Sequence, residues 1–303
     1  MRYSKFTQLY VVLVLTLAYT LSFIDRQILA IMIGPIKRDL GGLSDTQVSL
    51  ILGLAFSLVY ALSSLPLARI ADRSNRRNLL AAGIFGWSMM TALAGTANTY
   101  WQLFMARMGL GVGEAVLQPA ATSILADYYD QHRLPLAYGI IGCAPFVGTG
   151  LASILGGPLI DYLEAQPQIH LPVVGELFSW QLALMVVGLP GLLLAALMFT
   201  IKEPERIGEV AGETNKYSFR DLTIFVRSKG RFLFLYFLAF LCMSIHGYAY
   251  LTWVYELFVR KHDWSRTDIG LSFGSISMVT GPGRTVRSKT ESSRTLPLPS
   301  TTS

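Results

Sequence analysis

Residues 67–77 of this chain read Leu-Ala-Arg-Ile-Ala-Asp-Arg-Ser-Asn-Arg-Arg, a short polar stretch with four arginines around one aspartate. Apolar sequence precedes it from about 47 to 67 and follows it from about 79 to 97. Each of these runs is long enough to cross a bilayer, since a spanning helix needs about 20 apolar residues. We therefore expect a helical hairpin whose polar turn lies at a membrane surface.

The composition of the whole chain points to the same environment. Hydrophobic residues make up 52% of the sequence and charged residues 15%, with a mean hydropathy of +0.46, which is more apolar than a typical soluble domain. The net charge of +6 is compatible with nucleic-acid binding. However, the cations cluster at the ends of apolar runs, where membrane topology and anionic lipid account for them. We expect a lipid bilayer as partner and no nucleic acid.

The apolar runs predict seven membrane spans and the start of an eighth, at about 8–33, 47–67, 79–97, 101–126, 135–163, 180–201 and 232–258, and from Ile269 onward. The first run is too long for a secretory signal peptide and lacks a small-residue cleavage site, so we expect it to be retained. Lys and Arg number fourteen in the loops on the N-terminal side and five on the other. The positive-inside rule then predicts a multi-pass protein of the cell (inner) membrane with a cytoplasmic N-terminus.

The spacing of the spans predicts four regions. Residues 1–201 form a six-helix transmembrane bundle, and the polar residues 202–231 form a cytoplasmic linker. Residues 232–280 hold the seventh span and the start of the eighth, an incomplete second bundle. Residues 281–303 are rich in Ser, Thr, Pro and Arg, a composition typical of disorder. We expect this tail to be disordered or frame-shifted and the chain to be truncated.

Ionisable side chains are rare inside the predicted spans and fall in the first, fourth and seventh. They are Asp25 and Arg26, Arg107 and Glu114, and His246 and Glu256. An ionisable side chain at a helix centre costs about 2.5–3.5 kcal/mol on insertion scales, so such residues normally face a partner or a wet cavity. We therefore expect these three spans to share a cavity, which His246, Tyr250 and Trp253 line on the seventh.

The spacing of the charges also predicts their orientation. Arg107 and Glu114 are seven residues apart, so both project from one helix face, about 10 Å apart along the axis. Asp25 lies at a depth similar to that of Arg107, which is compatible with an ion pair between them. Two other interpretations stay open: the charges only hold helices together, and His246 is a hydrogen-bonded histidine without a further role. Glu256 is expected at the membrane interface.

Small residues recur every four positions in the fifth span, at Ala144, Gly148, Ala152 and Gly156. Such a stripe lets a neighbouring helix backbone approach closely. We expect it to serve helix packing, although helix pairs that move against each other use the same kind of surface.

No pattern in the chain indicates catalysis. The four histidines, His132, His170, His246 and His262, lack metal-ligand spacing, and the sequence holds no glycine-rich phosphate loop or nucleophile motif. We expect no enzyme activity, no cofactor and no metal site.

Three motifs together resemble a known family. The loop at 67–77 is similar to the pattern Gly-x-Leu-Ala-Asp-Arg-x-Gly-Arg-Arg/Lys of the major facilitator superfamily, with Ala68 and Asn75 in place of its two glycines and Ile70 in place of its leucine. The sequence Phe-Ile-Asp-Arg at 23–26 and the sequence Arg-Met-Gly-Leu-Gly-Val-Gly-Glu-Ala at 107–115 resemble the spinster-like branch of that family.

The resemblance implies an all-α membrane protein with the major facilitator fold, here an N-terminal six-helix bundle plus the start of a C-terminal bundle. It implies a secondary transporter, a symporter or antiporter that works by alternating access. Asp25 and Glu114 would take and release a coupling proton, and Arg26 and Arg107 would balance them or hold an anionic group of the substrate. The substrate would be a small organic or amphipathic lipid-like solute. As an alternative, the chain is a membrane fragment that transports nothing.

The same resemblance assigns a role to the loop at 67–77. In the family this loop is a cytoplasmic gate, in which the aspartate lies near the positive N-terminal end of the eleventh helix. Its residues in this chain are Asp72, Arg73, Arg76 and Arg77.

Overall fold

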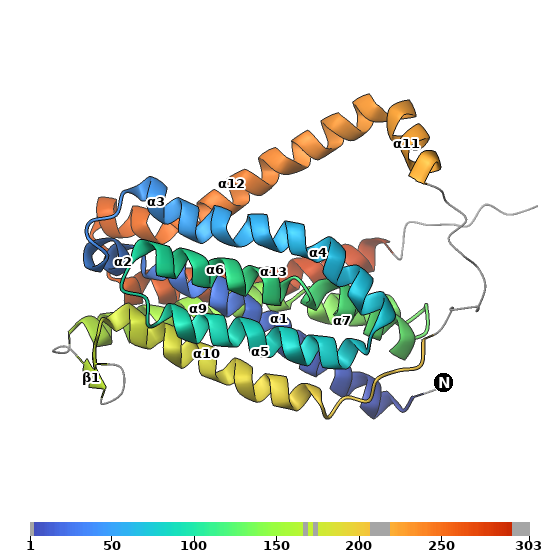
Figure 1. The fold of residues 1–303 in the computed structure, drawn as a ribbon, viewed down its shortest axis with the longest axis horizontal. Helices are drawn as coiled ribbons and strands as arrows, with labels where there is room; N and C mark the ends of the chain where they lie inside the picture. The colour runs from blue at the N-terminus through green and yellow to red at the C-terminus, as the bar shows by residue number, and fades with distance from the viewer. Residues whose placement is uncertain (1–2, 166–168, 172–174, 207–218, 293–303) are drawn as a thin grey trace, which may run out of the picture.

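The structure is a computed structural model that describes residues 3–165, 169–171, 175–206 and 219–292. Long helices run side by side in a bundle, with one short pair of strands in a loop (Figure 1). In chain order the elements are α1 (Lys5–Ile31), α2 (Ile33–Asp39), α3 (Asp45–Ser49), the π-helical turn η1 (Leu50–Leu54), α4 (Ala55–Arg73), α5 (Arg76–Ala94), α6 (Tyr100–Glu114), α7 (Leu117–Tyr128), α8 (Leu134–Ile141), α9 (Ala144–Glu164), β1 (Ile169–Leu171), β2 (Gly175–Leu177), α10 (Ser179–Met198), α11 (Phe219–Ser228), α12 (Gly230–His262) and α13 (Arg266–Ser292).

Each predicted span coincides with one helix or with helices that follow one another in line. The first span breaks at Met32 between α1 and α2, and the second contains the π-helical turn η1. The fourth breaks directly after Glu114, and the fifth breaks before α9. Pro119 and Pro145 lie in the first turns of α7 and α9. A proline is tolerated there because its missing N–H group would have no partner within the helix.

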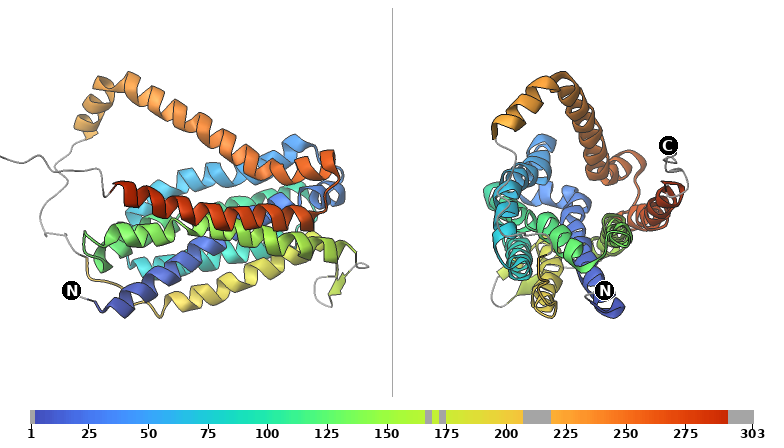
Figure 2. Two further views of the ribbon diagram at one scale, coloured as in Figure 1. Left: turned by 180° about the vertical axis from the view of Figure 1, so that it is seen from behind. Right: turned by 90° about the vertical axis from the view of Figure 1, so that its right-hand side faces the viewer.

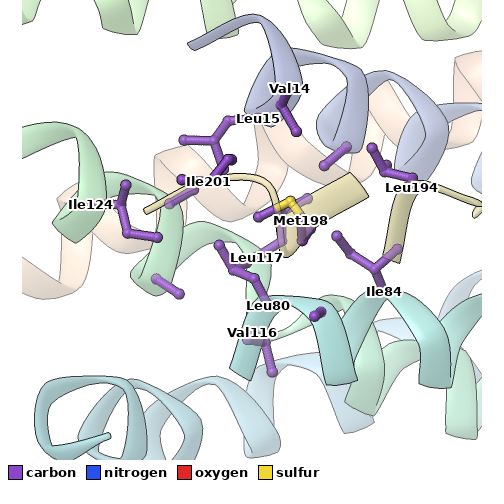
Figure 3. Packing of buried hydrophobic residues seen from close by; sticks show 14 of the residues in the cluster. Val14, Leu15, Leu80, Ile84, Val116, Leu117, Ile124, Leu194, Met198 and Ile201 are labelled. Atoms are coloured by element: carbon purple, nitrogen blue, oxygen red, sulfur yellow. The ribbon is translucent and has the colours of Figure 1, made fainter. Parts of the chain in front are cut away.

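Apolar packing between α1, α5, α7 and α10 forms the core of the bundle at one end. Leu15, Ile84, Leu117 and Met198, one from each of these helices, meet there (Figure 3). A second cluster lies toward the other end, around Trp180 and the junction of α1 and α2. Both clusters fill the interior between helices, as close packing of a helical bundle requires.

Large apolar side chains also cover the outside of the bundle. Leu65 of α4 is 75% exposed and Leu193 of α10 is 76% exposed. Within the described residues, five segments are long and apolar enough to cross a membrane: Lys5–Ile31, Asp45–Arg73, Leu134–Glu164, Ser179–Met198 and Gly230–His262. An apolar exterior of this extent is typical of helices solvated by lipid.

Helix α9 presents small residues on two faces, one more than the sequence indicates. A Cβ atom on Gly148 would lie 2.6 Å from the Thr20 carbonyl oxygen of α1, so the predicted stripe packs on α1. A Cβ atom on Gly157 would lie 2.3 Å from the Arg266 carbonyl oxygen of α13, and one on Gly270 would lie 2.3 Å from the Ser153 carbonyl oxygen. The backbones of α9 and α13 are therefore in close contact.

Helix α12 contacts the bundle only near its C-terminal end. The Gln27 side chain of α1 donates to the Leu251 carbonyl oxygen at 3.2 Å, and Tyr255 and Ser153 share a hydrogen bond between hydroxyls. Toward its N-terminus α12 diverges from α4 (Figures 1 and 2). We refer to the end of the bundle with Lys5 and the loop at 67–77 as the Asp72 end. The opposite end, with α2 and the strands, is the hairpin end.

Two regions differ from the expectation. The strands β1 and β2 pair antiparallel in the loop before α10, where no strand is predicted. Helix α13 continues to Ser292 instead of ending near 280, and Gly281 still packs on Phe146 of α9. The contact with α9 thus includes the first residue of the predicted tail. Residues 293–303 of that tail and 207–218 of the predicted linker lie outside the described residues.

Candidate functional site

A cavity of about 690 Å³ lies between α12 and the bundle, and we refer to it as the main cavity. Its walls come from α1, the segment α3–η1–α4, the junction of α6 and α7, and α12. They are mostly apolar and aromatic, with few polar groups: Tyr19, Phe23, Arg26, Ser49, Leu52, Gly53, Phe56, Ser57, Tyr60, Glu114, Leu117, Gln118, Leu241, Ser244, Ile245, Tyr248, Ala249, Thr252 and Trp253. A pocket of this size and character suits an organic ligand with a large apolar part.

One ion pair lies at the wall of the main cavity, between Arg26 of α1 and Glu114 of α6. The Arg26 Nε atom donates to Glu114 Oε2 at 2.6 Å, and Nη2 of the same guanidinium also contacts that oxygen. The Ser22 hydroxyl, one turn earlier on α1, donates to the same oxygen at 2.7 Å. The other carboxylate oxygen, Oε1, is buried and has no hydrogen-bond partner among the described residues. The charge of Glu114 is therefore only partly compensated by hydrogen bonds.

Aromatic rings surround the Arg26 guanidinium. Its Cζ atom lies 4.6 Å from the ring centre of Phe56, 5.0 Å from that of Phe23 and 5.4 Å from that of Tyr60. These distances fall within the range of cation–π attraction. The rings hold Arg26 at the cavity wall without adding a negative charge.

A smaller cavity of about 310 Å³ adjoins the main cavity, and we refer to it as the side cavity. The two cavities share lining residues, among them Phe23, Arg26, Phe56 and Tyr248. Arg107 of α6 lines the side cavity but not the main cavity. This arginine is 2% exposed, and within the part of the chain that the structure describes its Nε and Nη1 atoms have no hydrogen-bond partner. A buried guanidinium with unsatisfied N–H groups is a ready donor to an anion.

Asp25 lies apart from both cavities. It is 4% exposed and lines neither of them, although the next residue, Arg26, lines both. Consecutive residues of a helix point about 100° apart, which turns Asp25 into the bundle. Among the described side chains, the ion pair in this group joins Arg26 and Glu114 and not Asp25 and Arg107. The four charges therefore lie close together, but three of them face the cavities.

Of the three residues expected to line the cavity from the seventh span, the structure places only Trp253 there. The cavity face of α12 follows residues 241, 244, 245, 248, 249 and 252, a helical stripe. His246 and Tyr250 come directly after the pairs 244–245 and 248–249 of that stripe; they line neither cavity and are exposed. Glu256 is buried near the hairpin end, where it accepts a hydrogen bond from Arg260 at 2.7 Å.

Comparison with known proteins identifies the family to which this fold belongs. The sequence profile of the Major Facilitator Superfamily matches residues 15–297. The chain belongs to the Major Facilitator Superfamily. Its members are membrane transporters and not enzymes, and the predicted fold class is confirmed. Within the described residues, no group of three or more His, Cys, Asp or Glu side chains is arranged to hold a metal ion.

Similarity to individual proteins confirms the spinster-like resemblance. A solved bacterial homologue of the human lysosomal transporter Spinster, in an inward-facing and unoccupied conformation, superposes with a TM-score of 0.80 at 29% identity, over 97% of this chain and 64% of that one. An efflux pump of this superfamily from Mycolicibacterium smegmatis is 32% identical over 62% of this chain and 40% of its own length. The sphingosine-1-phosphate transporter SPNS2 of Danio rerio is 27% identical over 47% and 28%. The chain thus spans less than two thirds of each.

The family loop at 67–77 is divided between buried and exposed residues. Arg76 is 1% exposed and donates to Glu203 at 2.8 Å, to Ser123 at 2.8 Å and to Asp127. Burial acts to lower the pKa of Arg76, but the hydrogen bonds to Glu203 and Asp127 outweigh it and raise the pKa above its usual value. Arg76 is therefore a permanent cation that joins α5, α7 and the start of the linker.

The linker is attached to this loop by a second arginine. Arg206 donates to the carbonyl oxygens of Ala71 at 2.8 Å and Ser74 at 2.9 Å. It thereby satisfies carbonyl groups at the C-terminal end of α4, where a cation also meets the negative end of the helix dipole. Asp72 and Arg73 are exposed. The linker start is thus bound to the family loop.

Ion pairs close the hairpin end between the six-helix bundle and α12–α13. Arg260 of α12 makes a bidentate pair with Asp45 of α3 at 2.9 and 3.0 Å. Arg266 of α13 contacts Glu164 of α9 at 3.0 Å, and Arg38 of α2 contacts the same carboxylate at 3.1 Å. Asp39 and Glu164 raise the pKa of Arg38, so this residue stays charged.

Sequence reasoning did not identify the ion-paired residues of the hairpin end as a group. Their charges sit at span ends, where lipid headgroups and topology explain them equally well. Nothing in the sequence marks Ser22 or Phe56 as a site residue either, because serine and phenylalanine are common in apolar helices. Only their contacts with Glu114, Arg26 and Arg107 distinguish them.

Proposed function

We propose that this chain forms the substrate site of a proton-coupled transporter for an amphipathic organic anion. The observation that carries the proposal is Arg107, a buried guanidinium with unsatisfied N–H groups in a side cavity that adjoins a larger, mainly apolar cavity. The anionic group of a solute would bind at Arg107, and its apolar part would lie along the aromatic walls. The name of the zebrafish relative, a sphingosine-1-phosphate transporter, supports a solute with this combination of groups.

Glu114 is the candidate for proton coupling. It pairs with Arg26 at the wall of the main cavity while one of its oxygens has no partner. When the carboxylate is protonated, its attraction for Arg26 is lost, and the guanidinium becomes free to interact with a substrate anion. Asp25, which is also buried in this group, would add a second protonatable carboxylate. Protonation of Glu114 would thus favour binding of the substrate anion, because it releases Arg26.

The placement of the cavity supports alternating access in the cell (inner) membrane. The positive-inside count puts the Asp72 end, with Arg73, Arg76 and Arg77, in the cytoplasm. Helix α12 diverges from the bundle toward this end, while the ion pair between Arg260 and Asp45 joins it to the bundle at the hairpin end. Closing the Asp72 end and opening the hairpin end would expose the same site to the other side.

Ligand binding tests the proposed substrate class. The chain in nanodiscs is titrated with oleoyl lysophosphatidate, with uncharged monooleoylglycerol and with gluconate, a hydrophilic anion, and empty nanodiscs correct for partitioning. We expect lysophosphatidate to bind at least about tenfold more tightly than either comparison ligand, which corresponds to about 1.4 kcal/mol. Equal binding of monooleoylglycerol would contradict a role for the anionic group. Equal binding of gluconate would contradict a role for the apolar part.

A further inference from the structure

Phe56 of α4 lies between the two arginines of the site. Its ring centre is 4.6 Å from the Cζ atom of Arg26 and 5.4 Å from that of Arg107. The ring is 7% exposed and lines both cavities. One aromatic side chain therefore contacts both cations at the place where the cavities meet.

The contact of the Phe56 ring with Arg26 and Arg107 offsets part of the cost of burying two like charges close together. Arg26 is paired with Glu114, but the Nε and Nη1 atoms of Arg107 have no hydrogen-bond partner. Two like charges close together in an apolar region repel each other and are costly to desolvate. The face of an aromatic ring carries negative potential and attracts a guanidinium without occupying its N–H groups. A carboxylate in the same place would neutralise Arg107 and consume those donors.

Neighbouring backbone geometry fixes the position of the ring. The π-helical turn η1 ends at Leu54, two residues before Phe56, and such turns change the direction in which the following side chains point. On the facing helix, a Cβ atom on Gly111 would lie 2.8 Å from the Phe56 carbonyl oxygen. Glycine at 111 thus allows α4 to approach α6 closely enough for the ring to reach Arg107, which is one turn away on α6.

We propose that Phe56 is a positioning residue of the site, whose ring holds the Arg26 and Arg107 guanidinium groups in place so that Arg107 keeps its N–H groups available for the anionic group of the substrate. This role rests on the proposed function. Without the attraction of the ring, Arg107 turns toward the nearby carboxylates and its donors are no longer preorganised. The affinity for the anion then falls.

Graded fluorination of the ring tests the proposal with little change in shape. Phe56 is replaced by 4-fluoro-, 3,5-difluoro- and 3,4,5-trifluorophenylalanine in the full chain, because each fluorine weakens the negative potential of the ring face. The Kd of oleoyl lysophosphatidate is expected to rise stepwise, by about tenfold at the trifluoro ring. The Kd of monooleoylglycerol is expected to stay constant. The same series at Phe85, a 52% exposed residue of α5, is the matched control and should change neither value.

The outcomes separate this proposal from the proposed function. If the unmodified chain prefers lysophosphatidate and the Phe56 series leaves that preference unchanged, the role of Phe56 is overturned and the substrate class stands. If the unmodified chain shows no preference for the anion, both are overturned. Phe56→Leu, with its thermal unfolding midpoint measured alongside, gives a second measurement: a folded variant that binds lysophosphatidate as tightly as the unmodified chain also contradicts the role of the ring.

Discussion

At the scale of single residues, the site depends on which charges are satisfied within the protein and which are not. Glu114 accepts two donors, Arg26 and Ser22, on one oxygen and none on the other. Arg107 has two nitrogen atoms without partners. Buried polar groups in folded proteins are normally hydrogen-bonded, so exceptions at a cavity wall indicate groups that bind something else.

Glu114→Gln tests the coupling role. The amide keeps the size of the side chain but cannot gain or lose a proton, so uptake of substrate should lose its dependence on an imposed pH gradient while binding persists. Glu176→Gln, at an exposed position of strand β2, is the control and should keep the gradient dependence. Gradient-driven uptake that survives in Glu114→Gln would refute the assignment.

Arg107→Gln tests the substrate-charge role. Hydrogen bonds to a charged group contribute about 1.5–3 kcal/mol, so the loss of the guanidinium should weaken binding of oleoyl lysophosphatidate about tenfold or more. Arg107→Lys keeps the charge but not the planar set of donors and should show an intermediate Kd. The assignment fails if the glutamine variant binds the anion as tightly as the unmodified chain.

The sequence singles out these charged residues, because a charge in an apolar helix requires an explanation. It does not indicate which of them pair, since the ion pair joins Arg26 with Glu114 and not Asp25 with Arg107. It predicts the aromatic lining poorly. His246 and Tyr250 are one position off the cavity stripe of α12, since a helix of 33 residues without a strong polar face gives no indication of its rotation. Phe56 resembles every other apolar residue of its helix until its neighbours are known.

At the scale of helices, α9 packs against one neighbour inside the bundle and another outside it. Gly148 contacts α1, and Gly157 contacts α13. The four-residue repeat predicts the first face, because the stripe follows the period of the helix. The second face includes Gly157, the residue after Gly156 of the stripe. Its partner helix α13 lies more than 100 residues later in the chain, so no local pattern indicates this contact.

Gly157→Ala should destabilise the contact between α9 and α13. A Cβ atom at this position would lie 2.3 Å from a backbone oxygen, so the helices must separate, at a cost of about 1–3 kcal/mol. A lower midpoint of thermal unfolding in nanodiscs is the expected result. Gly86→Ala, where nothing lies within 4 Å, is the control and should leave the midpoint equal or higher. Equal effects of the two changes would contradict the close packing.

At the scale of the whole molecule, the arrangement is a helical bundle held closed at one end by ion pairs and open along α12 at the other. The apolar runs predict the helices and their order, and the family loop predicts the fold. Which end is closed depends on pairs such as Asp45 with Arg260, which are 215 residues apart. No local pattern in the chain relates two such residues.

Asp45→Asn should shift the molecule toward opening of the hairpin end. Exposed ion pairs contribute about 0–1 kcal/mol each, so the expected change is a modest redistribution and not a complete switch. Spin labels at Leu65 of α4 and Phe234 of α12, both exposed, should report an added population of shorter distances across the Asp72 end. Asp130→Asn, in an exposed loop, is the control. An unchanged distance distribution in Asp45→Asn would show that this pair does not hold the end closed.

Uptake into sealed proteoliposomes tests proton-coupled transport of an amphipathic anion most directly. Fluorescent lysophosphatidate is added outside, and back-extraction with albumin measures the fraction that has reached the inner leaflet. We predict uptake that increases with an imposed pH gradient, falls to the level of empty vesicles when a protonophore collapses the gradient, and loses the gradient dependence in Glu114→Gln. Uptake no faster than in empty vesicles, or uptake that ignores the gradient, would contradict it.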